Sequence, residues 1–539
     1  MGTAIFQDLW SGAGERGEAP ALRCGEVSLS FAAFFREILE AEAGLRALGV
    51  GAGDLVSILS LNTPETVAAF YAIDRVGAVA NWVDMKATPK EIEGYLNLAG
   101  SRVVLAVELA FDKVRAAMEH TPAEHLVCLP IAPYLAPALG EKLGLGGRDL
   151  SGLPGCLPWT DLLREPDGTE PETERWEEPA VITYTGGTTG PAKGVVLSRR
   201  AFHASLTQYT RAGTEYGKGG SALTLLPPFA AFGLCQCLHV PLCLGMTVIL
   251  APLFLPHQLG ELLVKYRPEQ VNATSSYWQL LLRSREAEGA DLSFLKVPRN
   301  GGDGMAAEME RRINAFLRER GCSAKLIKEY GMSEAGGIVC LNYGGSDTIG
   351  SVGRPLEGTW LCVVDSDTGE VLDEGEQGEI LISAPTQMNG YYNRPGGDDA
   401  VLKPGPGGFQ WVWTKDIGYL DGRGDLFITG RKKRMISRNG FKIFPSLLEE
   451  CLLQNPDVAD CAVVGGEMPS GETRPVAHIV LRHGADREEA EQALRRLCKR
   501  TLNFYTVPAA YVFREALPLT QRGKVDYRLL EAQSAGLGR

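Results

Sequence analysis

The stretch Tyr184-Thr185-Gly186-Gly187-Thr188-Thr189-Gly190-Pro191-Ala192-Lys193-Gly194 carries the most information about this chain. It lies between two apolar runs, Ala180-Val181-Ile182 and Val195-Val196-Leu197, which we predict to be strands. Glycines permit a tight turn whose backbone N–H groups point inward, and the threonine hydroxyls and Lys193 add donors and a cation. These groups suit a polyphosphate, whereas the simpler alternative is a Gly/Thr-rich surface turn.

This loop does not follow the Walker A pattern, which requires Gly, four residues, Gly-Lys and then Ser or Thr. Here Lys193 is followed by Gly194, and a strand rather than a helix is predicted next. The sequence therefore predicts a flap between two strands. It argues against an ordinary P-loop kinase or GTPase.

Four later segments carry residue types that suit a nucleotide, namely Glu329-Tyr330-Gly331-Met332-Ser333-Glu334, Trp413-Thr414-Lys415-Asp416, the basic segment 430–445, and Pro518-Leu519-Thr520-Gln521-Arg522-Gly523-Lys524-Val525-Asp526. An aromatic ring can stack on adenine, a carboxylate can bind Mg²⁺, and a long lysine can neutralise phosphate. Each segment also has a simpler interpretation: a helix start capped by Ser333, a turn aspartate, a solvated basic turn and an exposed lysine.

Taken in order, the five segments resemble the motifs of the adenylate-forming (ANL) superfamily. This superfamily includes acyl-CoA synthetases, peptide-synthetase adenylation domains and beetle luciferases. The resemblance implies a nucleotide site built from residues in all of these segments and from the turn at Gly301-Gly302-Asp303-Gly304. The implied nucleotide-binding residues are Thr185, Gly186, Gly187, Thr188, Thr189, Gly190, Lys193, Gly302, Asp303, Tyr330, Gly331, Ser333, Asp416 and Arg431.

The resemblance also assigns the catalytic roles. Glu334 would bind Mg²⁺ together with Thr188, and Lys524 would reach the carboxylate and the α-phosphate at once. Lys433 would be the hinge pivot, and Gly440, Phe441 and Lys442 would line the coenzyme A side.

Three positions depart from the family pattern. Lys415 replaces the usual glycine, Arg434 replaces a residue that is more often acidic, and Leu447 stands where glutamate is common. The last two changes put the local salt bridges in doubt.

The segment Pro227-Pro228-Phe229-Ala230-Ala231-Phe232-Gly233-Leu234 resembles the acid-binding motif of the superfamily. Peptide-synthetase domains place an aspartate after the first phenylalanine to bind an α-ammonium group, and this chain has Ala230 there. An α-amino acid is therefore disfavoured. An apolar acid, aliphatic or aryl, suits the expected pocket residues, which are Phe229, Ala230, Phe232, Tyr277, Trp278 and Met332. The alternative is that the aromatic residues, Trp278 above all, belong to the core.

Composition agrees with an enzyme of this kind. The chain has 539 residues, 45% hydrophobic and 22% charged, which implies more than one globular domain. Its net charge of −12 disfavours nucleic acid as a partner. We find no apolar run of roughly 18 residues and no signal peptide, and we expect a cytoplasmic protein. The twelve cysteines are expected to be reduced core residues, since a zinc site at Cys235, Cys237, His239 and Cys243 would lie among apolar neighbours.

The expected fold class is α/β, with alternating strands and helices up to residue 430 that predict parallel-rich sheets covered by helices. Shorter turns near Leu361–Asp365 and Gly378–Ile382 predict a small β subdomain. We expect an N-terminal AMP-binding domain at 1–430, a hinge at 431–434 and a small mobile α+β lid at 435–539.

The expected reaction is ATP-dependent activation of a carboxylic acid to acyl-AMP, followed by transfer to the thiol of coenzyme A, with Mg²⁺ as metal. A separate carrier protein, a peptide-synthetase-type adenylation enzyme and an oxidative luciferase remain alternatives. A non-enzymatic adenylate-binding relative would be expected to lack Lys524 or Glu334, and this chain has both.

Overall fold

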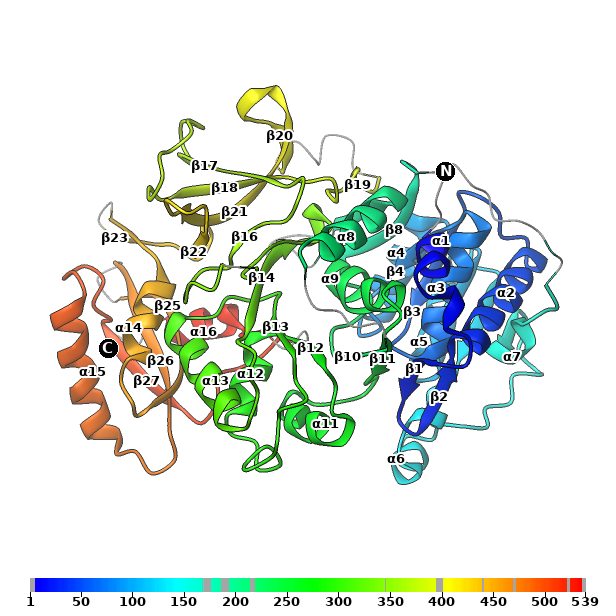
Figure 1. Cartoon of the computed structure of the whole chain (residues 1–539), viewed down its shortest axis with the longest axis horizontal. Helices are drawn as coiled ribbons and strands as arrows, with labels where there is room; N and C mark the ends of the chain where they lie inside the picture. The colour runs from blue at the N-terminus through cyan, green and yellow to red at the C-terminus, as the bar shows by residue number, and fades with distance from the viewer. Residues whose placement is uncertain are drawn as a thin grey trace.

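The computed structural model describes residues 5–166, 168, 176–185, 193–213, 219–344, 346–393, 401–438, 441–468, 472–520 and 524–535; for Phe441 and Lys442 it describes the backbone alone. Two large sheets form the body of the N-terminal part, a smaller sheet lies beside them, and the C-terminal part packs against one end (Figure 1). Among the described residues, no helix has the length and apolar character needed to cross a bilayer.

The first large sheet has eight strands in the order β19-β9-β8-β4-β3-β5-β6-β7. Its strands from β8 to β7 run parallel, while β9 is antiparallel to β8 and β19 is antiparallel to β9. The strands are β3 (Leu55–Leu59), β4 (Val79–Trp82), β5 (Val103–Val107), β6 (His125–Leu129), β7 (Cys156–Pro158), β8 (Pro179–Thr185), β9 (Lys193–Ser198) and β19 (Gly390–Tyr391).

The second large sheet has nine strands in the order β16-β15-β14-β13-β12-β10-β11-β1-β2. Its middle, from β14 to β1, is parallel. The strands are β1 (Pro20–Cys24), β2 (Val27–Ser30), β10 (Ser221–Thr224), β11 (Thr247–Leu250), β12 (Gln270–Ala273), β13 (Val297–Asn300), β14 (Ile327–Met332), β15 (Gly337–Leu341) and β16 (Arg354–Pro355).

Helices separate and cover these sheets. All thirteen residues of α3 (Pro64–Val76) are buried, as expected for a helix enclosed on every side. The other helices before the small sheet are α1 (Ile5–Ala13), α2 (Phe31–Ala47), α4 (Pro89–Ala99), α5 (Phe111–Met118), α6 (Pro137–Lys142), α7 (Trp159–Leu162), α8 (Arg199–Arg211), α9 (Ala231–Leu234), the π-helix η4 (Cys235–His239), α10 (Val240–Cys243), α11 (Leu259–Tyr266), α12 (Ser275–Leu281) and α13 (Ala307–Glu319).

The predicted small β subdomain is present, and its sheet is antiparallel. It joins β17 (Trp360–Val364), β18 (Gly378–Ser383), β21 (Gln410–Leu420), β20 (Leu402–Pro404) and β22 (Leu426–Arg431). The chain passes from β22 directly into the C-terminal part.

The C-terminal part, which we call the lid, is α+β. It contains the hairpin β23 (Ile436–Arg438) and β24 (Phe441–Ile443), the sheet β25 (Val458–Glu467), β26 (Thr473–Leu481) and β27 (Ala510–Arg514), and the helices α14 (Pro445–Leu453), α15 (Arg487–Thr501) and α16 (Tyr527–Ser534). The lid shares an apolar core cluster with α12 and α13, so it is packed against the N-terminal part in this structure. The α/β fold class predicted from the sequence is confirmed.

Candidate active site

The first group of site residues joins three strands, β14, β21 and β22. The Tyr330 hydroxyl donates to Asp416 Oδ2 at 2.9 Å, and Arg431 Nε lies 2.7 Å from Asp416 Oδ1. Asp416 and Arg431 are register partners on adjacent strands, which explains how residues fifteen positions apart meet. Burial, and next the charge of Asp416, raise the pKa of Tyr330, so its hydroxyl stays protonated and can donate.

The second group lies around Glu334, in the turn after β14. Glu334 is buried and its Oε1 accepts from the Tyr391 hydroxyl at 2.8 Å. The Lys193 ammonium lies 4.5 Å from the centre of the Tyr391 ring, an attractive cation–π geometry. Tyr391 therefore links Glu334, in the turn after β14, to Lys193 at the end of the glycine loop. Tyr391 belongs to none of the sequence segments that predicted the site.

The glycine loop connects β8 to β9, as predicted. Thr185 and Lys193 are the last register pair of these antiparallel strands, so the two ends of the loop lie side by side. The predicted phosphate ligands Gly186, Gly187, Thr188, Thr189 and Gly190 lie outside the described residues.

A third group surrounds Asp303, in the turn after β13. Burial raises the pKa of Asp303, while the positive charges of Lys524, Arg434 and Arg431 lower it. Three cations from the hinge and the lid thus act on one carboxylate of the N-terminal part. Ser275 Oγ donates to the Gly304 carbonyl at 2.8 Å and holds this turn against α12. Gly302 is exposed, and its φ of 82° is one that glycine adopts without strain.

The predicted acid-pocket residues differ in burial. Ala230, Phe232 and Met332 are partly exposed, whereas Phe229 and Tyr277 are buried. Phe232 covers the Gly301 backbone so closely that a Cβ there would lie 2.7 Å from the ring. Trp278 is completely buried in the core cluster and its Nε1 donates to the Arg299 carbonyl at 3.0 Å, which is the environment that the core interpretation expects. A cavity of about 10 Å³ lies between α3 and η4. It has room for about one water and is too small for an acyl chain.

The remaining predicted residues take the following places. Gly331 and Ser333 are partly exposed beside Tyr330, but Ser333 does not cap a helix: it begins a short 3₁₀ turn with Met332 at the N-cap position and no side-chain cap. Lys433 is exposed in the turn after β22. Gly440 and the side chains of Phe441 and Lys442 lie outside the described residues.

Arg434, which departs from the family pattern, has partners in the lid. Arg434 Nη2 lies 2.7 Å from Glu449 Oε1 on α14, and its guanidinium stacks 3.5 Å from the Tyr527 ring centre. Leu447, by contrast, is exposed. The turn after the hinge is therefore tied to α14 through Glu449 rather than through position 447.

Thus Tyr330, Asp416 and Arg431 connect β14 to β21 and β22, and Tyr391 connects the turn after β14 to the loop end. The charges of Lys524, Arg434 and Arg431 act on Asp303. The site thus brings together the Tyr330 ring, the buried carboxylates of Asp416 and Glu334, and cations from the hinge and the lid.

Comparison with known proteins gives the family. The chain belongs to the AMP-binding enzyme family of the adenylate-forming superfamily: residues 9–392 match the model "AMP-binding enzyme", and residues 447–524 match "AMP-binding enzyme C-terminal domain". It is 29% identical to a long-chain-fatty-acid–CoA ligase of Bacillus subtilis (strain 168) over 524 residues, which cover 94% of this chain and 90% of the relative. It is 30% identical to 4-coumarate–CoA ligase 2 of Oryza sativa subsp. japonica over 546 residues, 98% of this chain and 92% of the relative.

Solved structures share the fold over the whole length. The anthranilate CoA ligase AuaEII in complex with anthranoyl-AMP has a TM-score of 0.85 at 22% identity and covers 99% of this chain and 98% of its own. The amide bond synthetase McbA from Marinactinospora thermotolerans has a TM-score of 0.80 at 24% identity, covering 99% of this chain and 100% of its own.

Proposed function

We propose that this chain is an acid–thiol ligase that activates an apolar carboxylic acid with ATP and transfers the acyl group to coenzyme A. The observation that carries this proposal is the meeting of Tyr330, Asp416 and Arg431 within hydrogen-bonding distance, next to a turn on which Lys524 acts by charge. The relatives named as acid–CoA ligases support it.

In the first step a carboxylate oxygen of the acid attacks the α-phosphorus of ATP. A phosphorus–oxygen bond forms, the bond to the β-phosphate bridge breaks, and pyrophosphate leaves. Negative charge gathers on the phosphoryl oxygens, so cations placed there lower the barrier. Lys524 and Arg431 are the cations of the described chain that we assign to this task, and Asp416 is assigned to the ribose hydroxyls.

Glu334 is assigned to Mg²⁺, together with Thr188. A buried carboxylate is a hard oxygen ligand of the kind Mg²⁺ prefers, and Tyr391 fixes it by occupying one oxygen. When bound, the metal would supply positive charge between the phosphates. The adjacent Lys193 provides a second positive charge at the end of the loop.

In the second step the thiol sulfur of coenzyme A attacks the acyl carbon, the bond to AMP breaks, and the thiol proton passes to the medium. Lys524 is not needed once the adenylate exists. We therefore assign Lys524 to the first step alone.

The acid is assigned to the apolar class because Ala230, Phe232 and Met332 each expose part of an apolar side chain, and position 230 carries no carboxylate. ATP–pyrophosphate exchange over a panel of fatty, aryl and amino acids tests this, with thioester formation on coenzyme A measured in parallel and light emission recorded. Exchange only with amino acids, or acyl transfer only to a carrier protein, would contradict the proposal.

The lysine assignment has its own test. Lys524→Ala should nearly abolish pyrophosphate exchange while sparing thioester formation from preformed acyl-AMP. Lys499→Ala, an exposed lysine on α15, is the matched control and should leave both half-reactions unchanged. Equal loss of both half-reactions in Lys524→Ala would remove this residue from the first step.

A further inference from the structure

Helix α13 lies between the nine-stranded sheet and the lid (Figure 1). A helix turns 100° per residue, so Glu310 and Asn314 share one face while Arg312 points about 200° away from Glu310. One helix can therefore hold the N-terminal part with one face and the lid with the other.

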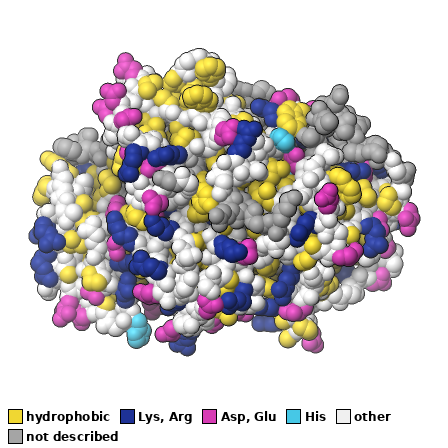
Figure 2. Space-filling model, viewed as in Figure 1, with side chains coloured by type: hydrophobic (Ala, Val, Ile, Leu, Met, Phe, Trp, Pro, Cys, Tyr) yellow, Lys and Arg dark blue, Asp and Glu magenta, His cyan; other side chains and the backbone are white. Residues whose placement is uncertain are grey.

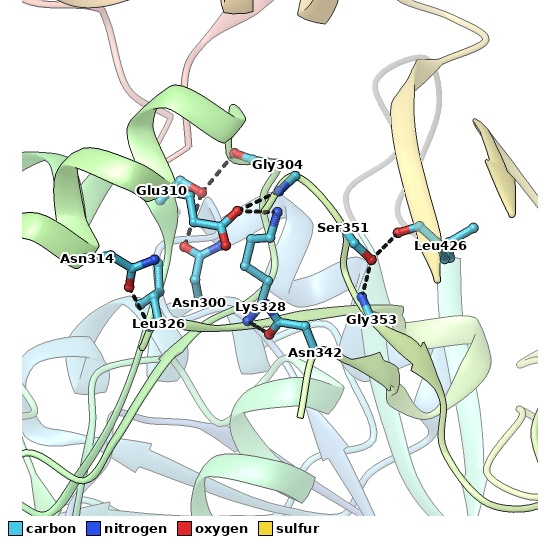
Figure 3. Close-up of polar contacts among 12 residues, drawn as sticks. Asn300, Gly304, Glu310, Asn314, Leu326, Lys328, Asn342, Ser351, Gly353 and Leu426 are labelled. Carbon is cyan, nitrogen blue, oxygen red and sulfur yellow. Dashed lines mark hydrogen bonds and ion pairs between the residues drawn. The ribbon is translucent and has the colours of Figure 1, made fainter. Parts of the chain in front are cut away.

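The inner face of α13 is anchored firmly (Figure 3). Glu310 Oε2 lies 2.8 Å from Lys328 Nζ, and both side chains are at most 3% exposed. The same oxygen accepts from the Gly350 backbone N–H at 2.9 Å. One turn later, Asn314 Oδ1 accepts from the Leu326 N–H at 2.7 Å. Because Lys328 lies two residues before Tyr330 on β14, α13 is fixed to the strand that carries the site.

The outer face of α13 binds the lid through one side chain. Arg312 Nη1 donates to the Val458 carbonyl at 2.7 Å, and Nη2 donates to the carbonyls of Leu453 and, at 3.4 Å, Asn455. These carbonyls lie at the C-terminal end of α14 and just beyond it, where backbone acceptors have no partner inside the helix and a cation is favoured. Glu308 accepts from Arg312 Nε at 3.3 Å and steadies the guanidinium.

This contact is protected from water and sits at the edge of an apolar interface. The Arg312 side chain is 13% exposed. Met309, Ile313 and Leu317 of α13 belong to the same core cluster as Leu448 and Leu452 of α14. A partly buried charged hydrogen bond contributes more than an exposed one.

We propose that Arg312 is a latch that holds the lid in the pose with Lys524 facing the Asp303 turn, and so favours acyl-AMP formation over thioester formation. This rests on the proposed function and on the hinge at 431–434 that the family resemblance implies, about which the lid would turn between the two steps. All three acceptor carbonyls belong to the lid, whereas the anchors of α13 belong to the N-terminal part. Rotation therefore breaks the Arg312 contacts and no anchor of α13, which gives this residue a different interaction with each pose.

The test compares half-reactions in Arg312→Ala and Arg311→Ala. Arg311 is the matched control, since it also pairs with Glu308, at 3.3 Å, but its side chain is 56% exposed and forms no hydrogen bond or ion pair with the described part of the lid. Arg312→Ala should lower pyrophosphate exchange at least fivefold and leave thioester formation from preformed acyl-AMP within twofold of wild type or above it. Arg311→Ala should stay within twofold in both.

Hydrogen exchange of the unliganded protein separates the latch from the reaction, because it requires no substrate. Amides of residues 445–458 should exchange at least fivefold faster in Arg312→Ala, while those of β12 and β13 stay unchanged. Arg312→Lys keeps the charge but loses the planar guanidinium, which donates to several carbonyls at once. Its effects should lie between those of the wild type and those of Arg312→Ala. Unchanged hydrogen exchange in residues 445–458, or equal loss of both half-reactions, would overturn the latch. Faster hydrogen exchange in a protein that activates no acid would overturn the proposed function and keep the contact between Arg312 and the lid.

Discussion

Lys415 adopts a backbone conformation that normally belongs to glycine. Its φ is 61°, and it is one of three non-glycine residues with positive φ in the described chain. The resemblance had marked this position only as a departure from a usual glycine. The structure gives the reason for that glycine: β21 bends here so that Asp416 faces Arg431, and the Lys415 carbonyl accepts from the Lys432 N–H at 2.9 Å.

Lys415→Gly should stabilise the protein. A side chain in the left-handed region costs about 1–2 kcal/mol, and the greater freedom of glycine in the unfolded chain offsets about 0.5–1 kcal/mol of the gain. A net increase of about 0.5–1 kcal/mol in the free energy of unfolding is expected, measured by denaturant titration. Lys415→Ala is the control, since it removes the same charge but keeps the strain. A Lys415→Gly protein that is less stable than Lys415→Ala would show that the backbone at 415 is not strained, since only the entropic cost of glycine would then remain.

Glu334→Gln should weaken the use of Mg-ATP. An amide is a poorer ligand than a carboxylate for a hard cation, while it can still accept from the Tyr391 hydroxyl. The Mg²⁺ concentration for half-maximal pyrophosphate exchange should rise at least tenfold, with a smaller effect on acyl-AMP binding. The exposed Glu374→Gln is the control. An unchanged Mg²⁺ dependence would remove Glu334 from the metal site.

At the scale of elements, the hydrophobic pattern predicted the alternation of strands and helices. The two strands predicted on either side of the glycine loop correspond to β8 and β9. Hydrophobic pattern succeeds there because each element buries one side or all of itself. The π-helix η4 was not predicted, because its extra residue per turn depends on the neighbours that pack against it. Tyr391 and Glu449 were missed for a related reason: their partners Glu334 and Arg434 lie in turns, 57 and 15 residues away along the chain.

The contact between α2 and α7 is expected to depend on pH. Glu37 Oε1 accepts from the Trp159 indole N–H at 2.8 Å, and burial raises the pKa of Glu37 to about 7. Below the unfolded pKa of about 4.3 the group is protonated in both states and has no effect. Between the unfolded pKa and pH 7, Glu37 is ionised in the unfolded state before it is ionised in the folded state. The free energy of unfolding therefore falls as the pH rises, and the loss is complete above pH 7.

Glu37→Gln keeps an acceptor for Trp159 and removes this ionisation. Its melting temperature should exceed that of wild type above pH 7, and the difference should disappear near pH 4. Glu40→Gln, a partly exposed glutamate on the same helix, controls for loss of one negative charge. A pH-independent difference would mean that Glu37 is ionised throughout.

At the scale of the whole molecule, acidic and basic side chains are interspersed over the viewed face rather than gathered into one basic patch (Figure 2). This fits a small-molecule enzyme better than a nucleic-acid-binding protein. The placement of the lid could not be predicted from the sequence, because it depends on side-chain contacts between residues far apart in the chain, such as Arg312 with Val458 just beyond α14. The order of the motifs predicted that the segments would form one site. It did not predict which side chains would contact one another there, such as Tyr330 and Asp416.

The hinge gives the last prediction. Lys433 lies in a turn that is closed by the Arg434 N–H donating to the Arg431 carbonyl at 2.9 Å. Proline at 433 would fix φ near roughly −65° and remove one backbone donor. We expect Lys433→Pro to hold the lid in the adenylating pose, so that pyrophosphate exchange stays within roughly tenfold of wild type, a barrier change of about 1.4 kcal/mol. Thioester formation should fall far more, as separate assays of one preparation would measure.

Two controls make this result specific to the pivot. Lys433→Ala removes the side chain without restricting φ and should leave both steps close to wild type. The melting temperature of Lys433→Pro shows whether the fold survives. Equal losses in both half-reactions would place the hinge elsewhere or indicate misfolding. If neither half-reaction changed, rotation about residues 431–434 would not be part of catalysis, and the latch at Arg312 would have no second pose to oppose, because a contact that never breaks cannot favour one half-reaction over the other.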